Sequence, residues 1–259
     1  MDAAAVLARY DEQVRRHPDA GAGRHVERDD RVVRVVADDD AWSGVVWSDL
    51  GDADADAVVA AEVRRFAELG QSWEWKYYSY DRPADLPRRL RAAGLVPDPV
   101  EGLLMAEVDA LDLTAPPPPD VRLVAVTDEV GAAALVRVHD EVFGGDHAAV
   151  GRALLAGLAQ RPRPVEAVLA VAAGTAVSAG RVEFHEGTEF ASLWGGGTLP
   201  GWRGRGVFRS VVARRAALAR ERGFRYLQVD ASAESLPILR RMGFVELATT
   251  TPYTSPSQP

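Results

Sequence analysis

Hydrophobic positions along the chain follow two periods, and the alternation between them predicts a mixed α/β protein. Apolar residues spaced three and four apart indicate one face of a helix, whereas short apolar or alternating runs indicate strands. In the first half of the chain, helices are expected over residues 3–16, 57–69 and 83–93, the last two ended by Gly70 and Gly94. Strands are expected over residues 31–36, 42–47, 73–80 and 103–108, with a turn at Asp38-Asp39-Asp40.

The second half of the chain shows the same two periods. A strand over residues 121–126 precedes helices over 128–143 and 148–160, with Thr127 as the expected cap of the first helix. Strands follow over residues 165–173, 176–184 and 190–197, and a hairpin at Gly174-Thr175 joins the first two. The remaining elements are a helix over residues 207–222, a strand over 225–230, a last helix from residue 235 and a final strand.

Four consecutive prolines separate the two halves. The stretch Thr114-Ala115-Pro116-Pro117-Pro118-Pro119 cannot continue a helix or a central strand, because proline fixes φ and lacks a backbone N–H. We therefore expect an N-terminal domain over residues 1–113, a stiff linker over 114–119 and a C-terminal domain over 120–259.

The joint between the strand over 190–197 and the following helix carries the sequence Arg203-Gly204-Arg205-Gly206. Two glycines allow a loop to fold so tightly that successive backbone N–H groups point in one direction. Together with the positive end of the helix dipole, such N–H groups form an anion site that suits a pyrophosphate.

This joint resembles the acyl-CoA loop of the GNAT acyltransferase superfamily, with Phe208 where the family prefers a small residue. Three further segments carry the resemblance: Thr198-Leu199-Pro200 before the loop, a strand over residues 225–230 after Gly223, and a last helix that ends in Gly243-Phe244. The resemblance covers residues 120–250. It implies an acyl-CoA N-acyltransferase fold, in which helices flank a mixed, mostly antiparallel sheet.

The resemblance also implies which residues hold acetyl-CoA, or another acyl-CoA, as co-substrate. Main-chain groups near Leu193–Leu199 would pair with the pantetheine, and the loop N–H groups would bind the pyrophosphate. For Ser235, capping of the last helix is the alternative to contact with the cofactor. The expected cofactor-binding residues are Thr198, Leu199, Arg203, Gly204, Arg205, Gly206, Val207, Phe208 and Ser235.

The two halves of the chain show a repeat at an offset of 153 residues. Val58-Val59-Ala60 corresponds to Val211-Val212-Ala213, and Gly70 corresponds to Gly223. This predicts a tandem GNAT-like duplication, to which chance agreement between generic α/β units is the alternative. The phosphate loop shifts onto Leu50-Gly51-Asp52-Ala53, where a carboxylate replaces a basic residue. A carboxylate repels a pyrophosphate, so we expect a degenerate N-terminal copy that binds no CoA.

The catalytic residues are less clear from the sequence. The family often uses a tyrosine as general acid four residues before the glycine of Gly-Phe, and that position here is Leu239. Tyr253, expected in the C-terminal tail, is a substitute. Glu183 on a central strand and Asp230 at a strand end are the candidate bases, with a solvated strand-face position and a capping role as their alternatives.

Two further groups of residues lie near the expected cleft. Gly195-Gly196-Gly197 within a strand indicates a bulge or a close backbone approach, or simply a flexible strand end. His139, Asp140, Asp146 and His147 surround the break between two helices, where the resemblance places the acceptor. A lone histidine at a helix end is commonly a cap or a surface residue.

Composition and charge exclude several classes of protein. The chain has 259 residues and no cysteine, which excludes disulfides and thiolate chemistry, and its five scattered histidines predict no metal site. Residues 1–119 carry 24 acidic and 14 basic residues, whereas residues 120–259 carry 14 and 16, so the half with the loop tolerates an anionic cofactor better. The sequence contains no basic stripe of the kind that would indicate nucleic-acid binding. It also contains no apolar run that approaches the ~20 residues needed to span a membrane.

Three functions remain open at this stage. The first is an acetyl-CoA-dependent N-acetyltransferase that acts on a small-molecule or peptide amine. The second is a non-catalytic acyl-CoA-binding or sensor protein, and the third is an interaction module that retains the fold alone. We expect a cytoplasmic protein, because the N-terminus lacks a secretory pattern, and a monomer or a homodimer.

Overall fold

The computed structural model describes residues 1–19, 21, 23–38 and 42–255, so most of the predicted turn at Asp38-Asp39-Asp40 lies outside the described residues. Apart from Met1, the chain divides into two compact units. The N-terminal unit contains Asp2–Leu103, Ala231–Ala233 and the chain from Glu246 onward. The C-terminal unit contains Leu104–Asp230 and Glu234–Val245. The predicted domain limits at residues 113 and 120 stay a prediction.

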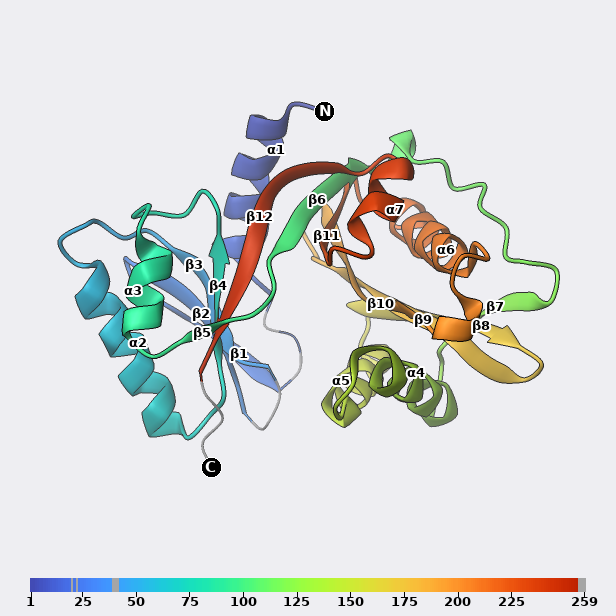
Figure 1. Cartoon of the computed structure of the whole chain (residues 1–259), viewed down its shortest axis with the longest axis horizontal. Helices are drawn as coiled ribbons and strands as arrows, with labels where there is room; N and C mark the ends of the chain where they lie inside the picture. The colour runs from blue at the N-terminus through green and yellow to red at the C-terminus, as the bar shows by residue number, and fades with distance from the viewer. Residues whose placement is uncertain (20, 22, 39–41, 256–259) are drawn as a thin grey trace. The chain divides into compact units, whose positions relative to one another are not determined.

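The C-terminal unit is a sheet with helices on both faces (Figure 1). Its strand order is β6-β11-β10-β9-β8-β7, with β10 and β11 parallel and β7 to β10 antiparallel. Helices α4 and α5 cover one face, and α6 covers the other. The elements are β6 (Glu101–Glu107), β7 (Val121–Ala125), α4 (Glu129–Phe143), α5 (Ala148–Ala159), β8 (Val165–Ala172), β9 (Thr175–Phe184), β10 (Phe190–Thr198), α6 (Val207–Glu221), β11 (Tyr226–Ala231) and α7 (Leu236–Arg241).

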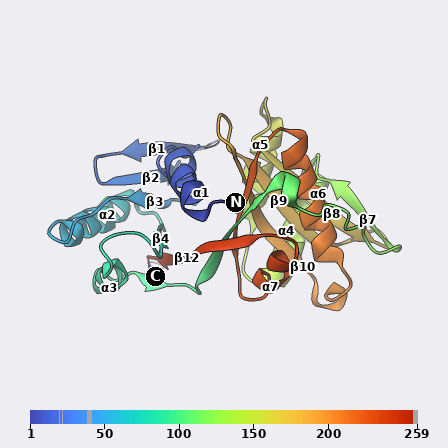
Figure 2. The same cartoon turned by 90° about the horizontal axis from the view of Figure 1, so that it is seen from above.

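The N-terminal unit is a smaller sheet with the order β1-β2-β3-β4-β12, and β5 also pairs with β12. Strands β1, β2 and β3 run side by side and antiparallel (Figure 2), whereas β3 and β4 are parallel. The elements are α1 (Ala3–Tyr10) with a π-helical turn (Asp11–Arg15), β1 (Arg24–Arg28), β2 (Val32–Ala37), β3 (Gly44–Ser48), α2 (Ala55–Leu69), β4 (Glu74–Tyr78), α3 (Leu86–Ala92), β5 (Val96–Pro97) and β12 (Val245–Thr254).

Each sheet includes a strand from the opposite half of the chain. Strand β12 follows α7 in sequence, yet Thr250 pairs with Tyr78 and Thr254 with Glu74 in the N-terminal unit. Strand β6 follows β5 in sequence, and its residues from Leu104 onward belong to the C-terminal unit beside β11. Position in the sequence therefore does not decide which sheet β12 and β6 join.

Both halves contain the repeated strand–helix–strand–helix series. Helices α2 and α6 each have 15 residues, and each ends near a glycine with positive φ, Gly70 at 65° and Gly223 at 81°. Parallel strand pairs flank the two helices, β3 with β4 and β10 with β11. The glycines after α3 and α7, Gly94 and Gly243, also have positive φ. At the 153-residue offset, α2 corresponds to α6 and β4 to β11 within one residue, whereas β3 and α3 do not align with β10 and α7. The tandem duplication stays a prediction.

Three local expectations need correction. Strand β1 (Arg24–Arg28) was not expected, because its mostly charged side chains give no apolar alternation. The cap of α4 is Asp128 rather than Thr127, since the Asp128 carboxylate accepts a hydrogen bond from the Gly131 N–H at 2.9 Å. Tyr253 lies in strand β12 and is buried in the N-terminal core, not in an irregular tail.

None of the helices formed by the described residues is long and apolar enough to cross a membrane.

Candidate functional site

The joint between β10 and α6 is a tight loop with two left-handed glycines. A 3-10 turn (Pro200–Trp202) leaves the strand, and Gly204 and Gly206 then adopt φ of 73° and 87°. Gly206 occupies the N-cap position, and no described side chain makes a capping hydrogen bond to the first turn of α6. A β-carbon at either glycine would meet no described atom within 4 Å, so the space over the loop is open. The first N–H groups of α6, which have no acceptor within the helix, therefore lie beside the open glycine loop, and this loop is called the cradle below. The first turn of α6 contains no acidic residue.

Arginines flank this cradle without entering a protein core. The Arg203 Nε donates to the Thr198 carbonyl at 3.1 Å, and its guanidinium lies 3.7 Å from the Glu234 carboxylate. The Arg205 guanidinium stacks 4.2 Å from the Trp202 ring centre and donates to Asp120 at 2.8 Å. Both side chains are over 40% exposed, so they remain available to a polyanion.

The segments on either side of the loop are fixed by packing and hydrogen bonds. The hydroxyl groups of Thr198 and Ser178 lie 2.8 Å apart, and Ser178 also donates to the Gly197 carbonyl at 2.7 Å. The Leu199 N–H donates to the Val177 carbonyl, which ties the strand exit to β9. Val207 is buried, and Phe208 is half-buried beside Gly196.

Strands β10 and β11 separate part-way along their length. Their parallel pairing runs from Phe190↔Tyr226 to Ser192↔Gln228 and stops there, although β10 continues to Thr198. A β-bulge lies between Trp194 and Gly197 on the side facing β9, as the glycine triplet predicted. Beyond Ser192, β10 therefore has an edge that is no longer paired with β11.

A histidine from α4 packs directly against this bulge. The Nε2 of His139 lies 2.8 Å from the Gly195 carbonyl oxygen, and a carbonyl only accepts, so Nε2 carries the proton. A β-carbon at Gly195 would lie 2.6 Å from the His139 ring, which requires glycine there. Burial, with Arg181 nearby, lowers the pKa of His139 from 6.5 to about 4, so the ring is neutral near pH 7.

An arginine from α6 reaches the bulge from the opposite face of the sheet. Arg215 is 1% exposed, and its guanidinium donates to the carbonyls of Arg181 (3.1 Å) and Trp194 (3.2 Å). Within the described chain, no carboxylate forms an ion pair with this guanidinium. Burial lowers the pKa of Arg215 to about 9, which leaves it charged at neutral pH. The carbonyls of Trp194 and Gly195 are therefore each held by a different helix.

Comparison with known proteins rests on structure alone. No protein-family model matches the chain, and neither does any curated protein sequence. Among solved structures, a GCN5-related N-acetyltransferase from Kribbella flavida is 19% identical with a TM-score of 0.73, over 99% of this chain and 96% of that one. A tandem GNAT protein from the clavulanic acid biosynthesis pathway is 13% identical with a TM-score of 0.60, over 92% and 85%.

A third match is a functionally unknown conserved protein from Staphylococcus epidermidis, 14% identical with a TM-score of 0.66, over 90% of this chain and 94% of that one. The chain has the fold of the GNAT superfamily. The predicted resemblance and the predicted fold class are both confirmed.

Within this GNAT fold, each candidate catalytic side chain has its own set of partners. Glu183 on β9 is 36% exposed and accepts from the Arg181 guanidinium at 2.8 Å. Asp230 near the end of β11 accepts from the Gln228 amide at 2.8 Å. Tyr253 belongs to the N-terminal core, where its ring packs edge-on against Tyr77. Its packing is that of a core residue. The catalytic roles of all three residues stay predictions.

Leu239 and Ser235 both belong to the last helix, α7, Leu239 within it and Ser235 at its N-cap. The Leu239 side chain is buried, and the carbonyl of Ser235 accepts from the N–H groups of Ile238 and Leu239. The Ser235 side chain makes no capping hydrogen bond. Its assignment to the cofactor stays a prediction.

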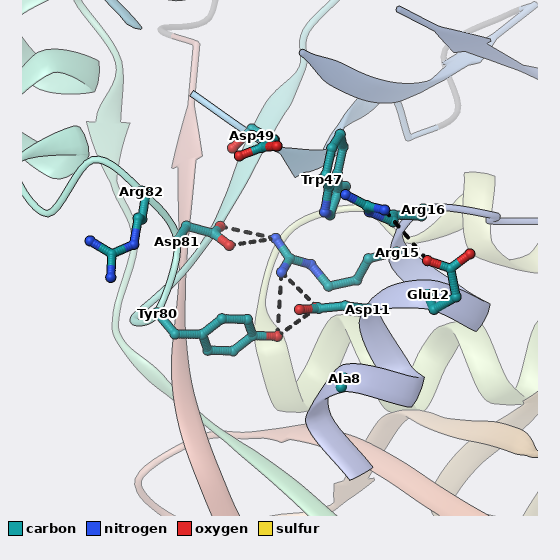
Figure 3. A pocket seen from close by; sticks show the side chains of 11 residues that line it. Ala8, Asp11, Glu12, Arg15, Arg16, Trp47, Asp49, Tyr80, Asp81 and Arg82 are labelled. Atoms are coloured by element: carbon teal, nitrogen blue, oxygen red, sulfur yellow. Dashed lines mark hydrogen bonds and ion pairs between the residues drawn. The ribbon is translucent and has the colours of Figure 1, made fainter. Parts of the chain in front are cut away.

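Sequence reasoning missed a pocket of about 330 Å³ in the N-terminal unit (Figure 3). Arg15, which is buried, donates to both Asp81 oxygens at 2.9 Å and to Asp11 at 2.8 Å. Tyr80 also donates to Asp11, and the Arg16 guanidinium lies 4.3 Å from the Trp47 ring centre. These residues come from three separate segments of the sequence, so no local motif could reveal them.

Over residues 1–19, 21, 23–38 and 42–255, no three His, Asp or Glu side chains gather as a ligand set.

Proposed function

We propose that this protein is an acyl-CoA-dependent N-acyltransferase, with acetyl-CoA as the expected donor and an amine as the acceptor. The observation that carries the proposal is the open glycine cradle at the start of α6. Gly204 and Gly206 leave the helix N-terminus uncovered, and Arg203 and Arg205 add positive charge beside it. This donor set suits a pyrophosphate.

The geometry of β10 supports the same proposal. Beyond Ser192 the strand has an edge without a β11 partner, and such an edge can pair with an amide-bearing chain such as pantetheine. Bound acyl-CoA would supply an acyl group activated as a thioester. The cofactor-binding residues would be Thr198, Leu199, Arg203, Gly204, Arg205, Gly206, Val207, Phe208 and Ser235.

The N-terminal unit supports the proposal by contrast. At the start of α2, the Asp54 carboxylate accepts from the Gly51 N–H at 2.8 Å and forms an ion pair with Arg31. The chain's own carboxylate thus occupies the region that an anion would take. We propose that this unit is a degenerate GNAT copy that binds no CoA.

A non-catalytic acyl-CoA-binding protein is the second candidate. The observation that favours it is Leu239, an apolar and buried side chain where the family often carries its acidic tyrosine. A thiol with a pKa near ~8.5 is a fair leaving group without an acid, so a leucine at this position permits turnover.

The test begins with calorimetric titration of the full-length protein with acetyl-CoA and, separately, with free CoA. We expect a dissociation constant in the micromolar range for acetyl-CoA. Release of free thiol is then measured with spermidine, kanamycin and a short peptide with a free N-terminus. Binding with amine-dependent thiol release supports the enzyme, and binding without turnover of any amine supports the sensor. No binding by a folded protein overturns both proposals and leaves the interaction module.

A further inference from the structure

Three aromatic side chains meet at the junction of α4 and α5, next to the glycine bulge. The ring centres of His139, Phe143 and His147 lie 5.4 to 6.0 Å from one another. His139 reaches the Gly195 carbonyl, and a β-carbon at Gly197 would lie 3.1 Å from the Phe143 ring. The three rings therefore form one surface that borders the bulge of β10.

The two histidines of this surface differ in what their nitrogens can do. The Nε2–H of His139 is committed to Gly195, and the ring is 1% exposed. His147 is 25% exposed, and its Nδ1 lies 2.9 Å from Asp140 Oδ1. The pKa of Asp140 is lowered by its hydrogen bond with His147, so the carboxylate is ionised and accepts the Nδ1–H. This tautomer leaves a lone pair on Nε2.

The Asp140–His147 pair is also fixed in orientation. The same Asp140 oxygen accepts from the His147 backbone N–H at 2.9 Å, and Asp146 accepts from the Ala148 N–H at 2.8 Å. The Nε2 atom of His147 has no hydrogen bond to any residue that the structure describes. A general base commonly has this arrangement, in which a carboxylate holds one imidazole nitrogen and leaves the other without a protein partner.

We infer that the Asp140–His147 pair is the general base of the acyl transfer, acting on a primary amine acceptor. The inference rests on the proposed function. The amine nitrogen forms a bond to the acyl carbon while the C–S bond breaks and its electron pair leaves with sulfur. An N–H proton of the amine passes to His147 Nε2, and the imidazolium then yields that proton to the departing thiolate through water. Asp140 acts as a positioning residue, because it touches the imidazole and not the acceptor.

The charged groups around His147 favour this role. Asp140 faces it from α4 and stabilises the imidazolium that forms, while neutral His139 adds no opposing charge. Asp146 precedes it in the chain, and Arg181 of β9 faces His139. The other candidates are held differently, since Glu183 is engaged by Arg181 and Asp230 by Gln228.

The experiment compares four variants on the full-length protein: His147→Gln, Asp140→Asn, Glu183→Gln and Asp230→Asn. Acetyl-CoA affinity is measured first by calorimetry, and we expect each variant to bind within threefold of the wild type. With the best amine found for the wild type, kcat/KM should fall at least 100-fold in His147→Gln and about 10-fold in Asp140→Asn. The acidic limb of the pH profile should disappear in His147→Gln. Glu183→Gln and Asp230→Asn, the competing candidate bases, should each lose less activity than His147→Gln. The exposed control variant His17→Gln should stay within threefold of the wild type.

A second readout does not depend on turnover. Nitrogen-15 NMR shifts of the His147 ring report which nitrogen carries the proton. Asp140→Asn should abolish the preference for the Nδ1–H form, because the carboxylate that accepts this proton is lost.

Each failure has a separate meaning. If acetyl-CoA does not bind the wild type, or no amine is turned over, the proposed enzyme function fails and the base assignment with it. If turnover occurs and His147→Gln keeps the wild-type pH profile, the base assignment alone is overturned. Loss of activity in Glu183→Gln or Asp230→Asn but not in His147→Gln would transfer the role to that carboxylate. An unchanged His147 tautomer in Asp140→Asn would refute the positioning role.

Discussion

The two strand–helix joints of this chain have the same frame but opposite electrostatics. At the start of α6, Gly204 and Gly206 are left-handed and open to the outside, and arginines stand beside them. At the start of α2, Gly51 donates to Asp54, and Asp56 in the first turn pairs with Arg89 at 3.0 Å. One joint presents a bare helix N-terminus, and the other neutralises its own.

The two buried arginines repeat this contrast inside the units. Arg15 in the N-terminal unit is neutralised by Asp81 and Asp11, and it stacks 3.7 Å from the Tyr78 ring centre. Arg215 in the C-terminal unit is satisfied by backbone carbonyls of β9, β10 and its own helix. Carboxylates therefore balance the charge of Arg15, whereas Arg215 keeps a positive charge beside the bulge that no described carboxylate pairs with. This difference is what a site for an anionic ligand requires.

The largest expected effect tests the buried arginines. Arg15→Met leaves Asp81 buried without its cation, so we expect a loss of about 3–5 kcal/mol in unfolding free energy. Arg215→Met leaves only backbone carbonyls without a donor, and about 1–3 kcal/mol should be lost. Urea unfolding followed by tryptophan fluorescence measures both. Equal losses of stability, or a larger loss for Arg215→Met, would contradict the difference inferred between the two buried arginines.

Next in size is the effect of a carboxylate at the two joints. Gly206→Glu places negative charge at the N-terminus of α6, and acetyl-CoA should bind at least ~100-fold more weakly, about 2.7 kcal/mol. Because φ is 87°, the variant should also lose about 1 kcal/mol of stability. Gly51→Glu is the matched control at the start of α2 and should keep wild-type affinity. Unchanged calorimetric affinity in Gly206→Glu would show that the loop is misassigned.

The pH dependence of stability tests the packing of His139 at the bulge, a feature described only in the C-terminal unit. With a pKa of about 4 in the folded protein and 6.5 unfolded, His139 is harder to protonate when folded. Its stabilising contribution is complete above pH 6.5 and is lost as the pH falls toward 4. Between pH 7 and 5 the loss should be about 2 kcal/mol.

His139→Gln keeps an N–H donor for Gly195 without the titration, so its unfolding free energy should change less over this pH range. His17→Gln, at an exposed position, is the control and should follow the wild-type curve. Parallel curves for His139→Gln and the wild type would contradict the prediction.

The smallest effect concerns the exposed pair at the cradle. Asp120→Asn releases Arg205 from its ion pair and should tighten acetyl-CoA binding about two- to threefold, with a stability change within ~0.5 kcal/mol. The gain should shrink at high salt and vanish in the Asp120→Asn/Arg205→Ala double variant. Affinity that stays constant in the single variant would mean that Arg205 does not contact the ligand.

Local sequence signals gave most of the elements and the candidate loop. The periodicity that predicted helices over residues 57–69 and 207–222 matches α2 and α6 within two residues, and Gly70 and Gly174 lie in the expected turns. The left-handed geometry of Gly204 and Gly206 follows from the lack of a β-carbon, which any tight turn exploits. Strand β1 escaped prediction, because Arg24, Glu27 and Arg28 leave no apolar stripe to read.

The sequence by itself determined the α/β pattern and the glycine–arginine loop, because each depends on residues within a few positions of one another. It also predicted the repeat, through a comparison of the two halves at an offset of 153 residues. Tertiary structure decided the rest. It placed β12, with Tyr253, in the N-terminal sheet, and it brought His139 and Arg215 to opposite faces of one bulge. Neither the His139–Gly195 contact nor the Arg215–Trp194 contact can be read from the local sequence, because a backbone carbonyl accepts from any donor that packs near it. The pairing of Asp140 with His147 likewise depends on how α4 and α5 turn around Gly144.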